Sequence, residues 1–194
     1  MRRSELILGS ALGLVLVGAL VAVVVIWFNG RPEAAFDINN IENLTAVEAY
    51  NLAQPVAQNW NGDAALLTAR AGWQPKVDFT DGRASWNFVF YSAAQRATAM
   101  ITVTDTEAQL VRSSLTSGQV QTGDLSGWQV DSPTAINELL RLGAEDFMAL
   151  HADVNLVLTL DNQGTTTWRS TFLDTETKQA YNLNITADTG EFTP

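Results

Sequence analysis

The sequence predicts an α+β protein in which one N-terminal transmembrane helix is followed by two small helix-plus-antiparallel-sheet repeats. Three observations lead to this prediction. Residues 6–28 contain no charged side chain. Apolar and polar residues alternate in several later segments, as in strands that bury one face. A short pattern in the first half of the chain also recurs in the second half.

The apolar segment 6–28 is predicted to be a membrane anchor. As a helix it would span roughly 34 Å, at about 1.5 Å per residue, which is enough to cross a bilayer. Trp27 and Phe28 occupy the expected aromatic belt, and Arg2 and Arg3 predict a cytoplasmic leading end. A cleaved signal peptide is the alternative, but the bulky end of the segment favours a retained anchor. We therefore expect a single-pass protein of the cell membrane with an extracytoplasmic C-terminal part.

Two further features concern the anchor and the residues that follow it. Gly9 and Gly13 form a G-x-x-x-G spacing, which permits close packing against a partner helix, although lipid-facing filler produces the same spacing. Residues 29–44 mix Pro, Gly, Asn and acidic residues without a clear period, so they are predicted to be a juxtamembrane tether. The predicted divisions so far are a cytoplasmic end at 1–5, the helix at 6–28 and the tether at 29–44.

The region 45–112 is predicted to be a helix followed by strands. Thr45 with Glu48 three positions later forms a capping box, and Pro55 is expected to kink or shorten the helix that follows. The clearest strand alternates Trp86, Phe88 and Phe90 with more polar neighbours. A linker is predicted at 113–130.

The same plan is predicted for residues 131–194. Asp131-Ser132-Pro133 is a helix entry, and apolar helical spacing continues from Ile136 to Gly143. Strands are expected at 154–160, from Trp168 onward, and around 181–185, where the last one ends at Asp188-Thr189-Gly190.

The two regions also match in sequence. GRASW at 82–86 corresponds to GTTTW at 164–168, an offset of 82 residues, and Phe90 corresponds to Phe172 at the same offset. We interpret this as a tandem duplication, with repeat 1 at 45–112 and repeat 2 at 131–194. The alternative is a single α+β domain whose strands resemble one another only because strands share a pattern.

Repeat 2 resembles a PepSY-type domain. The features that carry the resemblance are its Ala/Leu helix, its aliphatic strand, Trp168 at the start of the next strand, and the closing Ala187-Asp188-Thr189-Gly190-Glu191. Repeat 1 is similar but degenerate, with Asp105-Thr106-Glu107 at its end. The resemblance implies a helix packed on an antiparallel sheet in a cystatin-like manner, and a binding or inhibitory module without catalytic residues.

Six residues after the anchor are assigned structural roles. Trp86 and Trp168 are expected to lie on the sheet face beneath a helix rather than to stack on a ligand. Gly82, Gly164, Asp188 and Gly190 are expected to shape the turns.

Composition excludes several classes of function. The chain has 11 Lys and Arg against 21 Asp and Glu, a net charge of −10. Nucleic acid and anionic lipid heads would be repelled, because binding phosphates requires clustered cations. The chain has no cysteine, which excludes disulfides, thiolate metal sites and covalent haem.

No catalytic, cofactor-binding or metal-binding residue is predicted. His151 and Asp153 have the spacing of a metal pair, but a lone histidine at such a junction is more often a surface or capping residue. Asp161-Asn162-Gln163-Gly164 lacks the further ligands of a calcium loop and suits a hairpin turn.

We therefore expect a non-enzymatic, membrane-anchored extracytoplasmic binding or regulatory module for a peptide or protein partner. The alternative is an accessory structural subunit of a larger membrane complex, with the anchor as the main contact. A third hypothesis, a carboxylate-dependent hydrolase, would require a deep cleft with two convergent acids.

Overall fold

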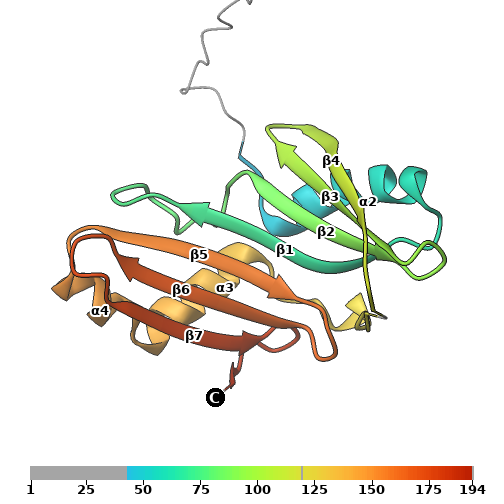
Figure 1. The fold of residues 1–194 in the computed structure, drawn as a ribbon. Coiled ribbons are helices and arrows are strands. Elements are labelled where there is room, and N and C mark those ends of the chain that lie inside the picture. The colour runs from blue at the N-terminus through green and yellow to red at the C-terminus, as the bar shows by residue number, and fades with distance from the viewer. Residues whose placement is uncertain (1–42, 119, 194) are drawn as a thin grey trace, which may run out of the picture. The chain divides into compact units, whose positions relative to one another are not determined.

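The computed structural model describes residues 43–118 and 120–193, and they form one compact α+β unit (Figure 1). The predicted span at 6–28, with Gly9 and Gly13, and nearly all of the tether lie outside these residues. None of the helices described is long and apolar enough to cross a membrane.

The described residues form helices and strands in the order helix, four strands, helices, four strands. Repeat 1 contains α2 (Ala46–Trp60), β1 (Ala65–Trp73), β2 (Trp86–Ser92), β3 (Ala97–Thr104) and β4 (Glu107–Leu115). Repeat 2 contains α3 (Ser132–Leu139), α4 (Glu145–Leu150), β5 (Val154–Asp161), β6 (Thr167–Asp174), β7 (Ala180–Thr186) and β8 (Phe192–Thr193). Thus β4 extends past the expected boundary at residue 112 to Leu115, and β8 was not expected.

All eight strands belong to one antiparallel sheet in the order β4-β3-β2-β1-β5-β6-β7-β8. The repeats are joined by their first strands, since β1 pairs with β5 from Thr68↔Asp161 to Trp73↔Leu156. The sequence predicted a separate sheet for each repeat. In the structure the two repeats share one sheet. A separate sheet of three or four strands would leave the long edge of β1 unpaired, and pairing with β5 removes that edge.

The helix of repeat 1 begins as predicted, and it continues past Pro55 to Trp60. The Thr45 side chain accepts a hydrogen bond from the Glu48 amide, and the Glu48 carboxylate accepts one from the Thr45 amide, so the capping box is confirmed. Pro55 lies inside α2 without shortening it, and its side chain is exposed. Four alanines of α2 are buried and let the helix lie close to the sheet: Ala46, Ala49, Ala53 and Ala57.

The helix of repeat 2 is broken where continuous helical spacing was predicted. A π-helical turn at Leu140–Ala144 separates α3 from α4, and Gly143 within it has φ = 116°. A non-glycine residue rarely adopts this backbone conformation. Gly143 therefore ends the regular helix instead of continuing its apolar stripe.

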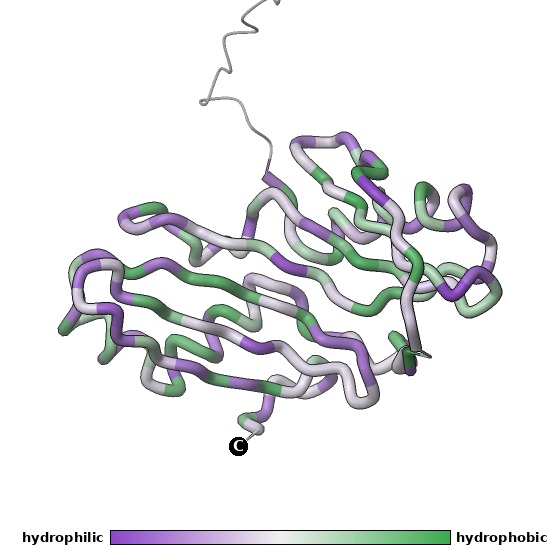
Figure 2. Tube along the Cα trace, in the orientation of Figure 1, coloured by the Kyte–Doolittle hydropathy of each residue, from purple (hydrophilic) through white to green (hydrophobic). Residues whose placement is uncertain are grey.

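The hydrophobic core lies between the helices and one face of the sheet. In Figure 1 the helices lie behind the strands, and Figure 2 shows apolar and polar residues alternating along most strands. Trp86 and Trp168 are fully buried, and one continuous cluster of buried side chains includes residues of both repeats. The two repeats therefore share one core.

Candidate binding surfaces

The two predicted structural tryptophans occupy equivalent places and lie side by side. The indole N–H of Trp86 donates to the carbonyl of Leu44 at 2.8 Å, and that of Trp168 donates to the carbonyl of Val130 at 2.8 Å. Each acceptor directly precedes the N-cap of its repeat's helix. The two ring centroids are 6.2 Å apart. Each tryptophan thus ties the start of a helix to the sheet, deep in the shared core.

Gly82 lies where the start of the second helix meets the first repeat. Its φ is +64°, and a Cβ on it would overlap the backbone of Ser132 and Pro133. The Ser132 hydroxyl donates to the Gly82 carbonyl at 2.8 Å and accepts from the Ala46 amide at 2.9 Å. The Asp131 carboxylate accepts from the Val47 amide at 3.0 Å. Side chains of repeat 2 therefore cap the helix of repeat 1.

The other predicted turn residues are spread around the sheet. Gly164 lies in the β5–β6 hairpin with φ = 109°, and nothing lies within 4 Å of an added Cβ. Asp188 and Gly190 form the turn between β7 and β8, and Gly190 has φ = 75°. The six structural residues thus do not form one site: the tryptophans meet in the core, and the others shape separate turns.

The far end of each helix is tied to the sheet in a parallel way. Asn61, the C-cap of α2, donates from its side-chain amide to the Ser92 hydroxyl at 2.6 Å, and that hydroxyl donates to the Asp63 carboxylate at 2.6 Å. His151, the C-cap of α4, places Nδ1 2.5 Å from the Asp174 carboxylate. Ser92 and Asp174 are the last residues of β2 and β6. His151 therefore holds the end of α4 against β6.

The Asp174 carboxylate is almost fully buried, with 4% of its side chain exposed. Burial would raise its pKa, but hydrogen bonds from the Thr177 hydroxyl, the Glu176 amide and His151 outweigh that effect. They hold the pKa of Asp174 well below its usual range.

The candidate metal and calcium residues are used in other contacts. Asp153 pairs with Lys76 at 2.8 Å, rather than joining His151. The described residues contain no group of three or more metal-ligating side chains. Asn162 is buried, and its side-chain amide donates to the Leu66 carbonyl at 2.9 Å and to the Gly123 carbonyl at 3.2 Å. Asn162 thus fastens the hairpin to β1 and to the linker, a role with no sequence signal.

The two outer edges of the sheet differ strongly. At one edge, β4 is nine residues long, and Leu110, Val111 and Leu115 are 43%, 55% and 85% exposed. Val111 forms a bulge, because Leu110 pairs with Ile101 while Arg112 pairs with Met100. At the other edge, the two-residue β8 pairs only with Asn184 and Ile185, so residues 180–183 of β7 have no strand partner on that side. Phe192 of β8 is 53% exposed. The long edge lies in repeat 1.

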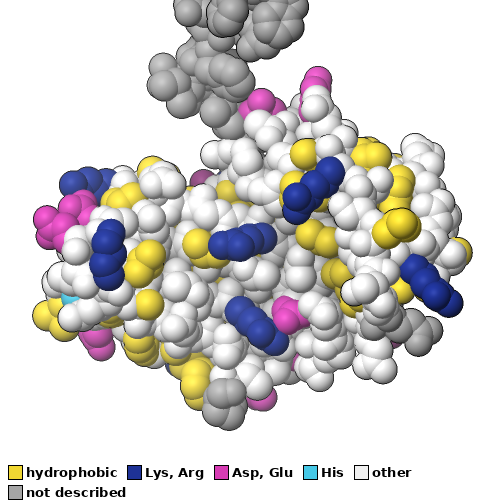
Figure 3. All heavy atoms as spheres, viewed as in Figure 1, with side chains coloured by type: hydrophobic (Ala, Val, Ile, Leu, Met, Phe, Trp, Pro, Cys, Tyr) yellow, Lys and Arg dark blue, Asp and Glu magenta, His cyan; other side chains and the backbone are white. Residues whose placement is uncertain are grey.

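The face of the sheet opposite the helices is open and polar. Figure 3 shows several Lys and Arg side chains spread across it and few acidic ones near its middle. Strand registers align one polar row across all eight strands, in which Arg70 and Arg169 flank Thr159. The whole row is Gln109, Thr102, Asn87, Arg70, Thr159, Arg169, Asn184 and Thr193.

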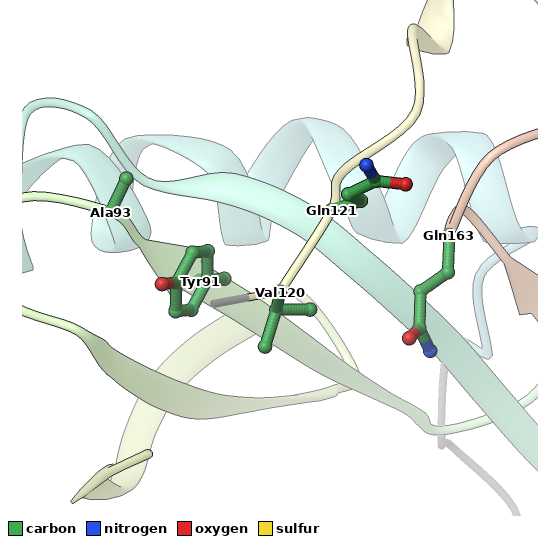
Figure 4. Close-up of a pocket in the computed structure, with 5 residues that line it drawn as sticks. All are labelled: Tyr91, Ala93, Val120, Gln121 and Gln163. Atoms are coloured by element: carbon green, nitrogen blue, oxygen red, sulfur yellow. The ribbon is translucent and has the colours of Figure 1, made fainter. Parts of the chain in front are cut away.

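A pocket of about 760 Å³ adjoins this face, beside the linker. Figure 4 shows Tyr91 from the end of β2, Val120 and Gln121 from the linker, and Gln163 from the β5–β6 hairpin around it. Tyr91 follows the core residue Phe90, so its side chain points to the opposite face, yet it is only 3% exposed. Sequence reasoning missed this residue, because alternation alone placed it on an uncovered face.

Comparisons with known proteins identify a fold and no family. No protein-family model matches the sequence, and no curated protein sequence matches it. The fold is similar to the crystal structure of a Clostridium difficile 630 protein described as a "putative lipoprotein", with a TM-score of 0.50 and 13% sequence identity. The match covers 79% of this chain and 97% of that one. At this identity the similarity concerns the helix and antiparallel-sheet fold alone.

Proposed function

We propose that this chain is a membrane-anchored, extracytoplasmic binding or regulatory module without catalysis of its own, and that its partner is a peptide or protein. The observation that carries the proposal is the exposed edge strand β4. The resemblance of repeat 2 to PepSY-type domains supports a binding role.

The length and composition of β4 suit pairing with an added strand. An edge strand presents unpaired backbone N–H and C=O groups, and extended peptides bind such edges by adding a strand. Soluble proteins usually protect long edges with charge, proline or a covering element. Here β4 has no proline and two charged residues, Glu107 and Arg112. Leu110, Val111 and Leu115 are exposed along it. Only the bulge at Val111 interrupts its regular backbone.

The proposed location rests on the anchor predicted at residues 6–28. The description of the Clostridium difficile protein as a lipoprotein is compatible with an extracytoplasmic domain held at a membrane. Membrane attachment would keep β4 close to partners in the same envelope and raise their effective concentration.

The test uses the full chain, purified from its native membranes in mild detergent, with co-purifying proteins and peptides quantified by mass spectrometry. Val111→Lys combined with Leu115→Lys places two charges on β4, and Phe192→Lys is the matched control on the opposite edge. We expect a stoichiometric partner with the wild type and the control, and its loss from the β4 variant. A partner retained by the β4 variant, or no partner with any form, contradicts the proposal.

The G-x-x-x-G spacing of Gly9 and Gly13 favours a second candidate function, an accessory subunit of a larger membrane complex. Replacing both glycines with leucine would prevent close helix packing and release the protein from such a complex. The β4 proposal expects the partner to remain bound, so the same purification separates the two functions.

A further inference from the structure

The edge strand β4 presents different chemistry on the two faces of the sheet. Its register with β3 places Leu110 opposite the buried core residue Ile101, so Leu110 points to the helix side. Arg112 lies opposite Met100, on the open face of the sheet that the helices do not cover. A strand added to β4 would therefore meet apolar side chains on one face and polar or charged side chains on the other.

The helix α2 extends the apolar side of this edge. It contacts both β3 and β4, and its residues Leu52 and Val56 are partly buried against the core. Tyr50 of the same helix stacks on Phe90 of β2. Leu52 lies about 200° around the helix from Tyr50, at about 100° per residue, so it belongs to the flank that faces away from β2 and toward β4. Leu52, Val56 and Leu110 thus form an apolar strip on the helix side of the edge.

Two charged residues of β4 lie on the open face. Glu107 pairs with Thr104 at the start of the strand, and Arg112 follows the bulge at Val111. Both side chains are exposed, and neither forms an ion pair with another residue that the structure describes. The Gln109 side chain donates to the Glu107 carboxylate at 3.4 Å. Opposite charges on an added strand would be favoured here, because directly opposed cross-strand charge pairs are stabilising.

The spacing of these charges sets an order on an added strand. Three ladder positions separate Glu107 from Arg112, because the bulged Val111 has no partner on β3. An antiparallel strand therefore places its acidic residue four positions before its basic one. Every strand pair of the described sheet is antiparallel, and antiparallel ladders are slightly more stable than parallel ones.

We propose that the partner of β4 is an amphipathic strand that pairs antiparallel to it. Its apolar side chains face the apolar strip, its acidic residue lies beside Arg112, and a basic residue four positions later lies beside Glu107. The inference rests on the proposed function of β4 and adds the sequence pattern that the site selects. Backbone hydrogen bonds alone would accept any extended chain, so these side-chain contacts supply the specificity.

The experiment measures peptide binding to the full chain in phosphatidylcholine nanodiscs by isothermal titration calorimetry at low ionic strength. The probe acetyl-STVEVTVKS-amide has the proposed order of charges, and acetyl-STVKVTVES-amide has the same composition with the two charges exchanged. We expect the probe to bind about four- to tenfold more tightly, because both cross-strand charge pairs change sign in the exchanged peptide. No binding of the probe, or equal or tighter binding of the exchanged peptide, overturns the proposal.

A double charge exchange in the protein tests the role of each charge. Glu107→Arg combined with Arg112→Glu keeps the net charge and alters only exposed side chains. The preference should then reverse, so that the exchanged peptide binds about four- to tenfold more tightly. Arg70→Glu is the matched control, because Arg70 is exposed on the same face in β1, three strands from the edge. It should leave the preference unchanged, and an unreversed preference in the double variant overturns the assignment of the charges.

A third peptide tests the apolar side of the strand. In acetyl-STSESTSKS-amide serine replaces both valines that flank the central threonine and the threonine and valine positions otherwise keep their spacing to the charges. This peptide should bind at least about tenfold more weakly than the probe, because it buries less apolar area against the strip. Undiminished binding would overturn the amphipathic pattern.

Further results separate this inference from the proposed function. Loss of the native partner from the Val111→Lys and Leu115→Lys variant, with no discrimination between the peptides by the wild type, would support the function and overturn the partner pattern. Light scattering of the purified full chain tests a second copy as the occupant. A dimer that this double lysine variant lacks would place a second copy on β4 and overturn the proposal.

Discussion

Repeat 1 and repeat 2 use the same two ties between helix and sheet but build the second tie from different chemistry. Trp86 and Trp168 hold the starts of the helices with matching indole hydrogen bonds. The far end is held in repeat 1 by Asn61 with Ser92, whose hydroxyl donates to the exposed Asp63 carboxylate. In repeat 2 it is held by His151 with the buried Asp174 carboxylate. The position of the tie is kept while the residues differ, so what the fold requires is a contact at that place.

The repeats also differ in what they leave exposed. Repeat 1 has one uninterrupted helix and a nine-residue edge strand, whereas repeat 2 has a helix broken at Gly143 and a two-residue edge strand. In repeat 2, β8 covers only part of the β7 edge, and Asp131 and Ser132 cap the first helix. We therefore propose that repeat 2 supports the fold and that repeat 1 binds the partner.

The largest expected effect comes from removing either core tryptophan. Trp86→Ala and Trp168→Ala should each lower the free energy of unfolding by about 3–5 kcal/mol, because a fully buried indole and its hydrogen bond are lost. Urea denaturation followed by circular dichroism measures this. Both variants should unfold in a single transition, since the repeats share one sheet and one core. Two separate transitions would show that the repeats fold independently.

A smaller and asymmetric effect is expected at the matched glycines. Gly82→Ala should cost about 2–5 kcal/mol, because it combines positive φ with overlap against Ser132 and Pro133. Gly164→Ala has the backbone strain without the overlap and should cost about 1–3 kcal/mol. Thermal unfolding of both variants measures the difference. Equal losses would indicate that the contact between Gly82 and the second helix is unimportant.

The pH dependence of stability should distinguish the two C-terminal ties. The pKa of Asp174 is lower in the folded state than in the unfolded chain, so its stabilising effect is present above about pH 4 and is lost as the pH falls below that value. Asp174→Asn should reduce the change of the melting temperature with pH between about pH 3 and pH 5. Ser92→Ala removes one of the hydrogen bonds that lower the pKa of the exposed Asp63 carboxylate, so it should change the pH dependence less than Asp174→Asn does. A wild-type-like acid profile in Asp174→Asn would contradict this difference.

The smallest effect on stability is expected at the outer edges. Val111→Lys, Leu115→Lys and Phe192→Lys all alter exposed side chains, so each should change the free energy of unfolding by less than about 0.5 kcal/mol. Equilibrium denaturation measures this. A large loss in the β4 variants would mean that Val111 and Leu115 stabilise the fold, and partner loss would then not report on binding.

Local signals predicted local structure well. The capping box at Thr45, the helix entry at Asp131, and the strands containing Trp86, Trp168 and Leu158 all lie where the sequence placed them. These features depend on neighbouring residues, so periodicity and capping chemistry are sufficient to locate them.

Features that depend on distant residues were not predictable in the same way. Pairing of β1 with β5 depends on tertiary contacts between the repeats. The sequence of neither strand specifies which strand of the other repeat lies next to it. Tyr91 has the pattern of an exposed strand residue and is buried beside Val120 of the linker. The candidate pocket was missed for that reason, since a crossing loop leaves no period in the strand it covers.

The central β1–β5 pair also bears on how such a chain arises. Its antiparallel registers and mirrored strand order relate the repeats by an approximate twofold axis between these strands. A protein of one repeat would expose β1 and could satisfy it by pairing with β1 of a second molecule, as a symmetric dimer does. The present chain has the architecture of such a dimer fused into one polypeptide. Fusion allows the two halves to diverge in sequence, so the nine-residue β4 forms one outer edge while the two-residue β8 covers part of the other.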